Sequence, residues 1–188
     1  MNNKGFTLIE AIVSLAIFIV ISSTLAEIVV VSIQNQIKVS TMQNMFNQAI
    51  FSLDKIEKEL RMAKKDFTGT CIESEKNYSI VAGSSITFLY NDQESTVGPL
   101  CKKFALESNR IYEYVSTDDT IANLSATGIA ITSSSISIDS LEFISANDTS
   151  SDFMQPKVTI AMLISSQGLE NQIPLNFQTT ISQRRLDL

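Results

Sequence analysis

The first third of the chain has the least interrupted pattern of the whole sequence. From Phe6 to Thr68 there is no Gly and no Pro, although both recur beyond that point. Because these two residues are the strongest breakers of regular structure, the stretch predicts one continuous helix. At 1.5 Å per residue such a helix is about 90 Å long, which exceeds the width of a small domain. We therefore expect it to cross a membrane, to join a bundle, or to do both.

The beginning of this helix is almost purely apolar. Residues 11–26 (AIVSLAIFIVISSTLA) contain no charge, and extending the run to residues 6–33 adds only Glu10 and Glu27. About twenty predominantly apolar residues span the hydrocarbon core of a bilayer. Residues 6–33 are therefore expected to form a membrane-spanning helix. Lys4, just before the run, favours a short cytoplasmic N-terminus and a translocated remainder.

The pattern changes over residues 34–68, where apolar and polar positions alternate with helical period. One apolar position recurs every three or four residues, as in a helix with one buried face. Such a face packs either on the chain's own C-terminal domain or on partner helices, and we favour the own-domain role for residues 46–63. The apolar positions are Val39, Met42, Phe46, Ala49, Leu53, Ile56, Leu60 and Ala63.

After Thr68 the sequence is typical of β-structure, with short β-branched and aromatic runs between turn residues. Alternating apolar positions from Val158 to Ile164 predict a strand with one buried face. Hairpin turns are expected at Ser108-Asn109 and at residues 168–171. The expected strands are Ser85–Tyr90, Lys102–Glu107, Arg110–Val115, Gly128–Thr132, Ser135–Ser145, Lys157–Ser165 and Gln172–Ser182.

These patterns predict an α+β fold in which a long N-terminal helix packs on an antiparallel β-sheet domain. The expected organisation is a membrane helix at residues 6–33, an amphipathic continuation at 34–68, and a β-rich extracytoplasmic domain at 69–188. That domain, about 120 residues long, is large enough to bury a modest core of its own.

Composition excludes several classes of function. The 188 residues include no His, no Trp and two Cys, and the formal net charge is −6. Histidine-based catalysis, histidine-ligated zinc and iron–sulfur clusters are thereby excluded. The acidic balance argues against a nucleic-acid partner, which favours a basic surface. No nucleophile motif or metal-ligand spacing is present, so we expect no enzyme activity, no cofactor and no metal.

Cys71 and Cys101 both lie in the part expected outside the cytoplasm, where disulfides are permitted. A bridge between them would close a loop of about thirty residues and contribute roughly 3–4 kcal/mol in the chain-entropy model. The alternative is two separate buried thiols, because sequence spacing does not show whether their Cα atoms lie close together.

The most specific sequence feature is the segment Lys4-Gly5-Phe6-Thr7-Leu8-Ile9-Glu10. It resembles the processing signal of type IV pilins and pseudopilins, in which a short basic leader ends in Gly before Phe-Thr-Leu-Ile-Glu. The resemblance implies that residues 1–5 are a leader, removed by a prepilin peptidase after Gly5, and that Phe6 becomes an N-methylated amino terminus. A carboxylate at the start of a membrane helix is costly to bury unpaired. In this family Glu10 would pair with the terminal amine of a neighbouring subunit.

Two further segments resemble a narrower group, the J-type minor pseudopilins and the related W-type minor pilins. They are the helix at Ile50–Ala63 and the chain end at Phe177–Arg184. Major pilins usually have a helix-kinking Pro where this chain has Glu27, which favours a minor subunit. We interpret Glu27 as a residue at the outer membrane interface rather than as a second pairing site.

The resemblance implies a structural subunit of a type II secretion or type IV pilus-like filament, assembled near its tip. Its implied partners are other pseudopilins or minor pilins, the prepilin peptidase, an inner-membrane assembly platform and membrane lipid. The implied location is the cytoplasmic membrane, and then the filament. The alternative function is a single-pass membrane-anchored binding module. An ordinary signal peptide cleaved after Ala26 is disfavoured, because its apolar region would be too long and would contain Glu10.

Overall fold

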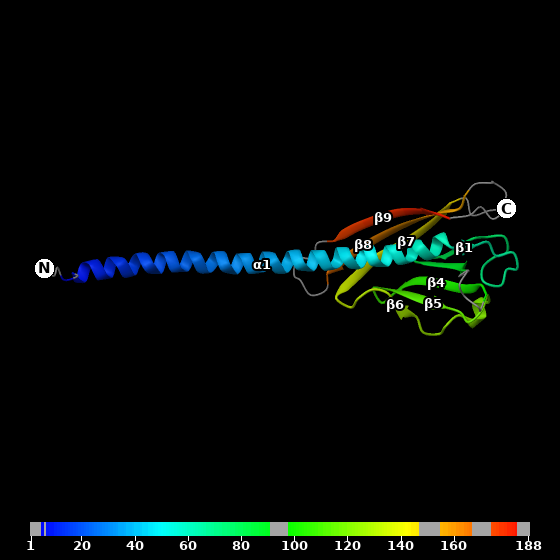
Figure 1. Cartoon of the computed structure of the whole chain (residues 1–188), viewed down its shortest axis with the longest axis horizontal. Helices are drawn as coiled ribbons and strands as arrows, with labels where there is room; N and C mark the ends of the chain where they lie inside the picture. Colours follow the sequence, from blue (N-terminus) through cyan, green and yellow to red (C-terminus); the bar gives the residue numbers. More distant parts are fainter. Residues whose placement is uncertain (1–4, 6, 91–97, 147–154, 167–173, 184–188) are drawn as a thin grey trace. The chain divides into compact units, whose positions relative to one another are not determined.

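The computed structural model describes residues 5, 7–90, 98–146, 155–166 and 174–183 (Figure 1). The chain forms two compact units, residues 1–43 and residues 44–188. The expected hairpin at residues 168–171 lies outside the described residues, as do Phe6 and residues 1–4 of the expected leader. The boundaries at residues 5 and 33 stay predictions.

The expected helix is present and is named α1 (Leu8–Arg61). It ends seven residues before the predicted end at Thr68, so the extension of the helix to that residue was wrong. Ala63 and Lys64 instead form β1 (Ala63–Lys64), which pairs with Tyr90 and Leu89 of a neighbouring strand. Hydrogen bonding to a sheet edge here outweighs local helix propensity, which is a weak prior on structure.

The first sheet is antiparallel and has the order β1-β3-β4-β5-β6, with β2 also pairing with β3. The hairpin predicted at Ser108-Asn109 is confirmed between β4 and β5, and both residues have the positive φ that tight hairpin turns need. The remaining strands are β2 (Ser79–Val81), β3 (Ser85–Tyr90), β4 (Leu100–Glu107), β5 (Arg110–Val115) and β6 (Ile129–Ala130), and a short 3₁₀ helix η1 (Ile121–Asn123) precedes β6.

The second sheet has three antiparallel strands in the order β7-β8-β9. They are β7 (Ile136–Ala146), β8 (Lys157–Ser166) and β9 (Leu175–Ser182). β7 also joins the two sheets, because the N–H of Ile138 donates to the carbonyl of Asn109 and the N–H of Phe143 donates to that of Gly83. The predicted alternation in β8 is confirmed, since Val158, Ile160, Met162 and Ile164 are all buried.

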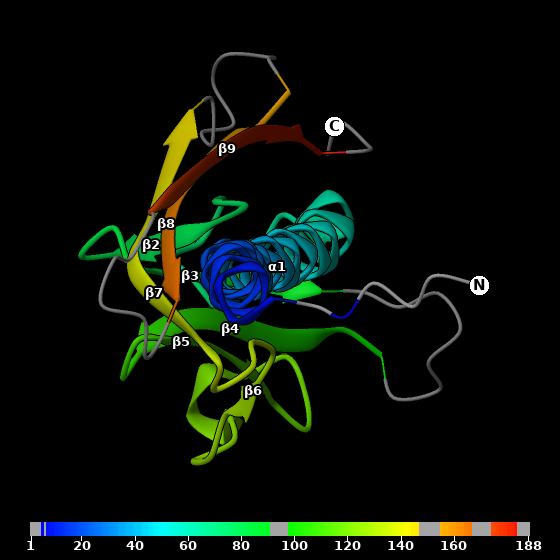
Figure 2. The ribbon, with the colours of Figure 1, turned by 90° about the vertical axis from the view of Figure 1, so that its left-hand side faces the viewer.

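Within residues 44–188, the second half of α1 lies between the two sheets, with β9 along one side and β4 along the other (Figure 2). The predicted apolar face is buried at Ala49, Leu53, Ile56, Leu60 and Ala63, which confirms its own-domain role there. Phe46 is the exception, because it is 50% exposed while the preceding Met45 is buried. The result is an α+β fold of the pilin-like kind, with one long helix on antiparallel sheets.

Cys71 and Cys101 are joined in a disulfide, with a Cα–Cα distance of 5.5 Å. The loop that holds Cys71 is organised by the buried carboxylate of Asp66, which accepts hydrogen bonds from the backbone N–H groups of Thr68, Gly69, Cys71 and Ile72. Burial alone would raise the pKa of Asp66, but these bonds favour the charged form more strongly and lower it to about 2.

Four alternating charges fix the helix to the first sheet. Lys55 and Glu59 of α1 face Lys102 of β4 and Glu113 of β5, and each ammonium lies 2.9–3.3 Å from both carboxylates. The two glutamates and Lys102 are nearly buried. Burial acts to raise the pKa of Glu113, but the hydrogen bond from Lys55 and the charge of Lys102 lower it overall. We call this group the charge square.

Candidate functional site

The candidate site begins at the first turn of α1, where Thr7 and Glu10 interact within the chain. The carbonyl of Thr7 accepts from the N–H groups of Glu10 and Ala11 at 3.1 and 3.2 Å, which starts the helix. In return, the Glu10 carboxylate accepts from the hydroxyl and the N–H of Thr7 at 3.3 and 3.5 Å. The bond from the Thr7 N–H is one of the two bonds of a capping box, so Glu10 stabilises the helix start besides any role between subunits.

Gly5 precedes this turn and is fully open. It is exposed, and a Cβ atom added to it would meet nothing within 4 Å in the described part of the chain. Nothing in the described part of the chain covers Gly5, and cleavage after it stays a prediction. Phe6, the expected new amino terminus, lies outside the described residues, so its role stays a prediction.

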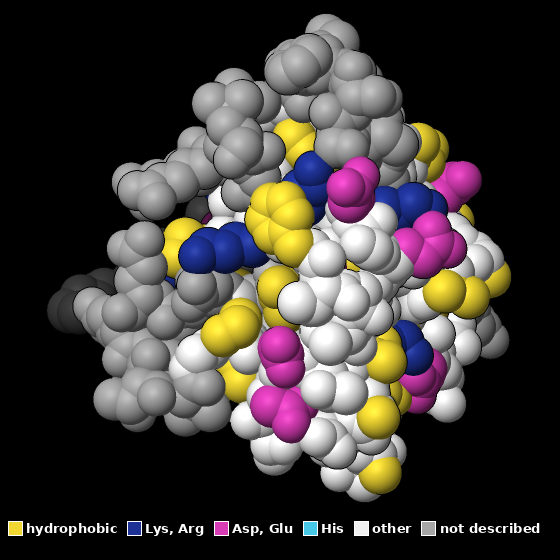
Figure 3. All heavy atoms as spheres, turned by 90° about the vertical axis from the view of Figure 1, so that its right-hand side faces the viewer, with side chains coloured by type: hydrophobic (Ala, Val, Ile, Leu, Met, Phe, Trp, Pro, Cys, Tyr) yellow, Lys and Arg dark blue, Asp and Glu magenta, His cyan; other side chains and the backbone are white. Residues whose placement is uncertain are grey.

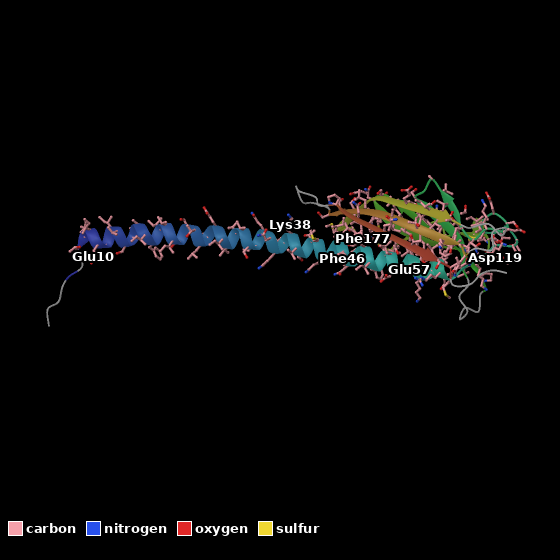
Figure 4. All side chains as sticks on the ribbon, turned by 90° about the horizontal axis from the view of Figure 1, so that it is seen from above. Glu10, Lys38, Phe46, Glu57, Asp119 and Phe177 are labelled. Atoms are coloured by element: carbon pink, nitrogen blue, oxygen red, sulfur yellow. A yellow bond between two sulfur atoms is a disulfide. The ribbon has the colours of Figure 1, made fainter. Side chains whose placement is uncertain are left out.

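Apolar side chains cover the helix all round from Leu8 to Ile33, and none of them is buried in the described part of the chain. Ile9, Phe18, Val20 and Ile28 are each more than 60% exposed. Of the described helices, only α1 is long and apolar enough to cross a membrane. The apolar stretch near its N-terminus that meets this condition contains no buried residue. Figure 4 shows Glu10 in the first turn of this apolar segment. A helix that is apolar on every face needs a lipid or protein environment outside the chain.

Two hydroxyl groups in the middle of this apolar segment have hydrogen-bond partners within the helix. Ser23 donates to the carbonyl of Val20 and Thr24 donates to that of Ile21, both at 2.9 Å. Local bonds of this kind lower the cost of placing a hydroxyl in lipid, since each donor keeps a partner. The side chain of Glu27, one turn further along, makes no hydrogen bond or ion pair within the described residues.

Residues 44–188 expose a smaller apolar area on the same helix. Phe46, Ile50 and Phe51 are 40–57% exposed, and the Phe46 ring lies 5.7 Å from that of Phe177 in β9. Figure 4 shows Phe46 and Phe177 side by side. Figure 3 shows the end face of the domain. Its hydrophobic, acidic and basic side chains are scattered among uncharged ones, in contrast to the apolar area around Phe46.

No group of three or more metal-ligating side chains comes together in the parts of the chain that the structure describes. The expected absence of a metal site stays a prediction.

Sequence reasoning missed Thr7 as the hydrogen-bond partner of Glu10. The signal was present, because Thr-x-x-Glu before an apolar run is the spacing of a capping box. It also missed the charge square, for which the sequence offers only Lys55 and Glu59 at helical i, i+4 spacing. Lys102 and Glu113 join them through the sheet register, which no local pattern specifies.

One comparison with known families gives a match at this site. Residues 1–26 match the family described as "Prokaryotic N-terminal methylation motif". The match covers Gly5, Phe6, Thr7 and Glu10, together with the start of the apolar helix.

No curated protein and no solved structure matches the chain. The J-type subtype therefore has no support from a relative. The motif, the long apolar helix and the antiparallel sheets agree with one another, and the chain thus has a prokaryotic N-terminal methylation motif of the type IV pilin and pseudopilin kind on a pilin-like α+β fold.

Proposed function

We propose that this protein is a minor pseudopilin or minor pilin, a structural subunit of a type II secretion or type IV pilus-like filament. The observation that carries the proposal is Glu10, a carboxylate in the first turn of an apolar helix that the chain itself does not bury, within a methylation motif. Such a group is expensive in a membrane and is functional by default. Its function here is assembly rather than catalysis.

Processing prepares the partner that Glu10 needs. Cleavage after Gly5 makes Phe6 the amino terminus, and its ammonium group is a cation at the depth of the carboxylate. In the filament, Glu10 of one subunit pairs with the amine of its neighbour and sets the register between the two helices. N-methylation of Phe6 leaves that positive charge in place.

The subunit begins in the cytoplasmic membrane, with its short N-terminus in the cytoplasm and its C-terminal domain outside. Its partners are the prepilin peptidase, membrane lipid, the inner-membrane assembly platform and the other subunits. Once assembled, the apolar half of α1 exchanges lipid for neighbouring helices. Residues 44–188, held together by the charge square and the disulfide, form the part that contacts other subunits or cargo.

Three observations support a minor subunit of the J type near the filament tip. Glu27 stands where major pilins usually have a kinking Pro, and α1 continues through this region without a break. The sequence segments Ile50–Ala63 and Phe177–Arg184 resemble those of J-type pseudopilins. Arg184 lies outside the described residues.

Mapping the amino terminus of the mature protein tests the proposal most directly. We expect a peptide that begins at Phe6 and carries one additional methyl group on its amine. A chain that begins at Met1, or one that begins beyond Ala26, would contradict the proposal.

The Glu10→Gln variant separates the proposal from a membrane-anchored binding module. Gln keeps the capping-box hydrogen bond but removes the charge, so the helix start is preserved. A filament subunit with this substitution should insert and be trimmed normally, yet be lost from sheared filaments. A simple anchored module should be unaffected by the same substitution.

A further inference from the structure

One edge of the second sheet is open. The eight-residue strand β9 pairs with β8 on one side. On its other side it makes no backbone hydrogen bond with the part of the chain that the structure describes. Every second residue of an edge strand turns its N–H and C=O groups away from the sheet. β9 therefore presents a row of unpaired donors and acceptors.

The other sheet edges among the described strands are short or tied down. β1, β2 and β6 are two or three residues long, and the N–H groups of Ile138 and Phe143 tie β7 to the first sheet. Proteins usually protect a long edge with charges, prolines or bulges. β9 (LNFQTTIS) has no charge and no Pro, and its register with β8 contains no bulge. It is therefore suited to receive a further strand.

The open edge lies beside the second half of α1. The Phe177 ring of β9 is next to that of Phe46, and six residues later the side-chain amide of Gln183 donates to the carbonyl of Ala63. β9 and this part of α1 therefore run side by side in the same direction. Within residues 44–188 the second sheet curves around α1, with β9 at one end of the curve (Figure 2). A strand added to β9 would continue that curve over the helix.

The side of α1 next to β9 is apolar and uncovered. Phe46 and Ile50 are 50% and 40% exposed, and their spacing of four residues places them on the same side of the helix. Phe51 is also exposed, but it lies about 100° further round the helix. Neither residues 39–53 nor residues 174–183 contain a charged side chain. The surface thus matches an uncharged strand with apolar side chains on the face toward α1.

We propose that the β9 edge is a docking site for an extended segment of another filament subunit, which adds to the sheet as a further strand. In this segment apolar residues alternate with uncharged polar ones. The apolar side chains cover Phe46 and Ile50, while the polar ones continue the exposed row of Asn176, Gln178 and Thr180. Main-chain hydrogen bonds supply the affinity. The identity of the partner as a filament subunit rests on the proposed function.

The β9 strand of a second copy of this chain does not fit as the occupant. Two identical edges pair about a two-fold axis, which makes the two strands antiparallel. Because β9 runs in the same direction as the second half of α1, the second halves of the two helices would run in opposite directions. Subunits that enter one filament from one membrane point the same way. The occupant is therefore a segment of a different protein.

Photocrosslinking in cells that contain the assembly machinery tests the site. We expect benzoylphenylalanine at Gln178 of the full chain to capture another filament subunit, through an uncharged segment of alternating character that mass spectrometry identifies. The same probe at Glu142, which is exposed on β7, is the control and should not capture that segment. Capture of only this chain, or capture through a charged segment, would overturn the inference.

Two aspartate variants test the predicted position of the added strand. Ile50→Asp places a charge beneath the strand and should lower the amount of the Gln178 crosslink at least tenfold. Phe51→Asp is the matched control, because it changes the adjacent exposed residue on a different side of the helix, and it should leave the crosslink unchanged. Equal crosslinking in the two variants would contradict this position.

Peptide binding to the purified full chain in detergent keeps this site distinguishable from the proposed function. The probe is a fluorescein-labelled peptide of residues 175–182, which carries no membrane helix to limit its direction. We expect saturable binding that Ile50→Asp weakens at least tenfold and that Glu10→Gln leaves unchanged, since no assembly is needed. Binding to a chain whose mature terminus is not Phe6 would refute the proposed function alone. A chain that begins at Phe6, but neither binds the peptide nor forms the Gln178 crosslink, would refute the β9 site alone.

Discussion

The two halves of α1 differ in apolar content and have opposite surroundings. Leu15, in the first half, is 60% exposed, whereas Leu60, in the second half, is fully buried. The first half exposes apolar side chains on every face. The second half has one buried apolar face that contacts the sheets, and only a smaller apolar area on it is exposed. The partner of the second half belongs to the same chain, and that of the first half must come from outside it.

This difference shows how one helix serves two environments. An apolar surface without polar interruption fits lipid or a bundle of similar helices, which tolerate many orientations. A single apolar face bordered by charged residues fits one packing partner in one orientation. The charge square belongs to the second kind, because it aligns Lys55 and Glu59 with particular residues of β4 and β5.

The largest expected effect comes from a leucine substitution in each half. Leu60→Ala should lower the free energy of unfolding by about 4 kcal/mol, because it leaves a cavity in a fully packed position. Leu15→Ala is the matched control and should leave domain stability unchanged. All four tyrosines lie beyond residue 68, so tyrosine fluorescence of the full chain in detergent follows domain unfolding in urea. Equal midpoints for the two variants would contradict the division of the helix.

Removing the disulfide should have a slightly smaller effect, again confined to residues 44–188. Replacing Cys71 and Cys101 by Ala reopens a 30-residue loop in the unfolded chain and should cost about 3–4 kcal/mol. The same urea titration with and without reductant measures it. If reductant leaves the midpoint of the unsubstituted chain unchanged, the bridge is absent or contributes nothing.

Acid should weaken the domain through Asp66. The pKa of this carboxyl is about 2 in the folded chain and near 3.8 when unfolded, so its contribution is complete above about pH 5 and is lost as the pH falls toward 2. The loss amounts to about 2 kcal/mol. Asp66→Asn should be less stable at pH 7, with a difference from the unsubstituted chain that shrinks in acid. A difference that is constant with pH would refute the assignment.

The smallest expected effect is the removal of one charge from the square. Glu113→Gln leaves Lys55 and Lys102 to share Glu59, and should cost about 1–2 kcal/mol because these groups are largely shielded from water. Glu57→Gln removes a more exposed carboxylate paired with Arg61 and should cost less than about 0.5 kcal/mol. Equal losses in the two variants would mean that the square adds no specific stability.

Local patterns predicted most of the elements. The absence of Gly and Pro from residues 6–68 predicted α1, and β-branched runs predicted β3 and β5 with their observed limits. The Thr-Leu-Ile-Glu segment predicted the site. These features depend on residues close in sequence, where propensity and periodicity act directly.

The features that the sequence did not predict depend on contacts between distant residues. β1 forms only because β3 offers a sheet edge to Ala63. Met45 is buried in place of Phe46, which instead lies beside Phe177 of β9. Asp66 has no sequence signal beyond its charge, although it organises the loop of Cys71. Tertiary geometry sets all three, and a single sequence does not specify it.

The Cys71–Cys101 bridge also determines how the subunit responds to mechanical load. When tension reaches both ends of the chain, force passes through the sulfur atoms and bypasses the 30-residue stretch between them. That stretch would otherwise lengthen by about 100 Å when fully extended. β2 and β3 therefore remain inside a closed covalent ring, and tension on the chain ends does not pull the stretch that contains them into an extended strand.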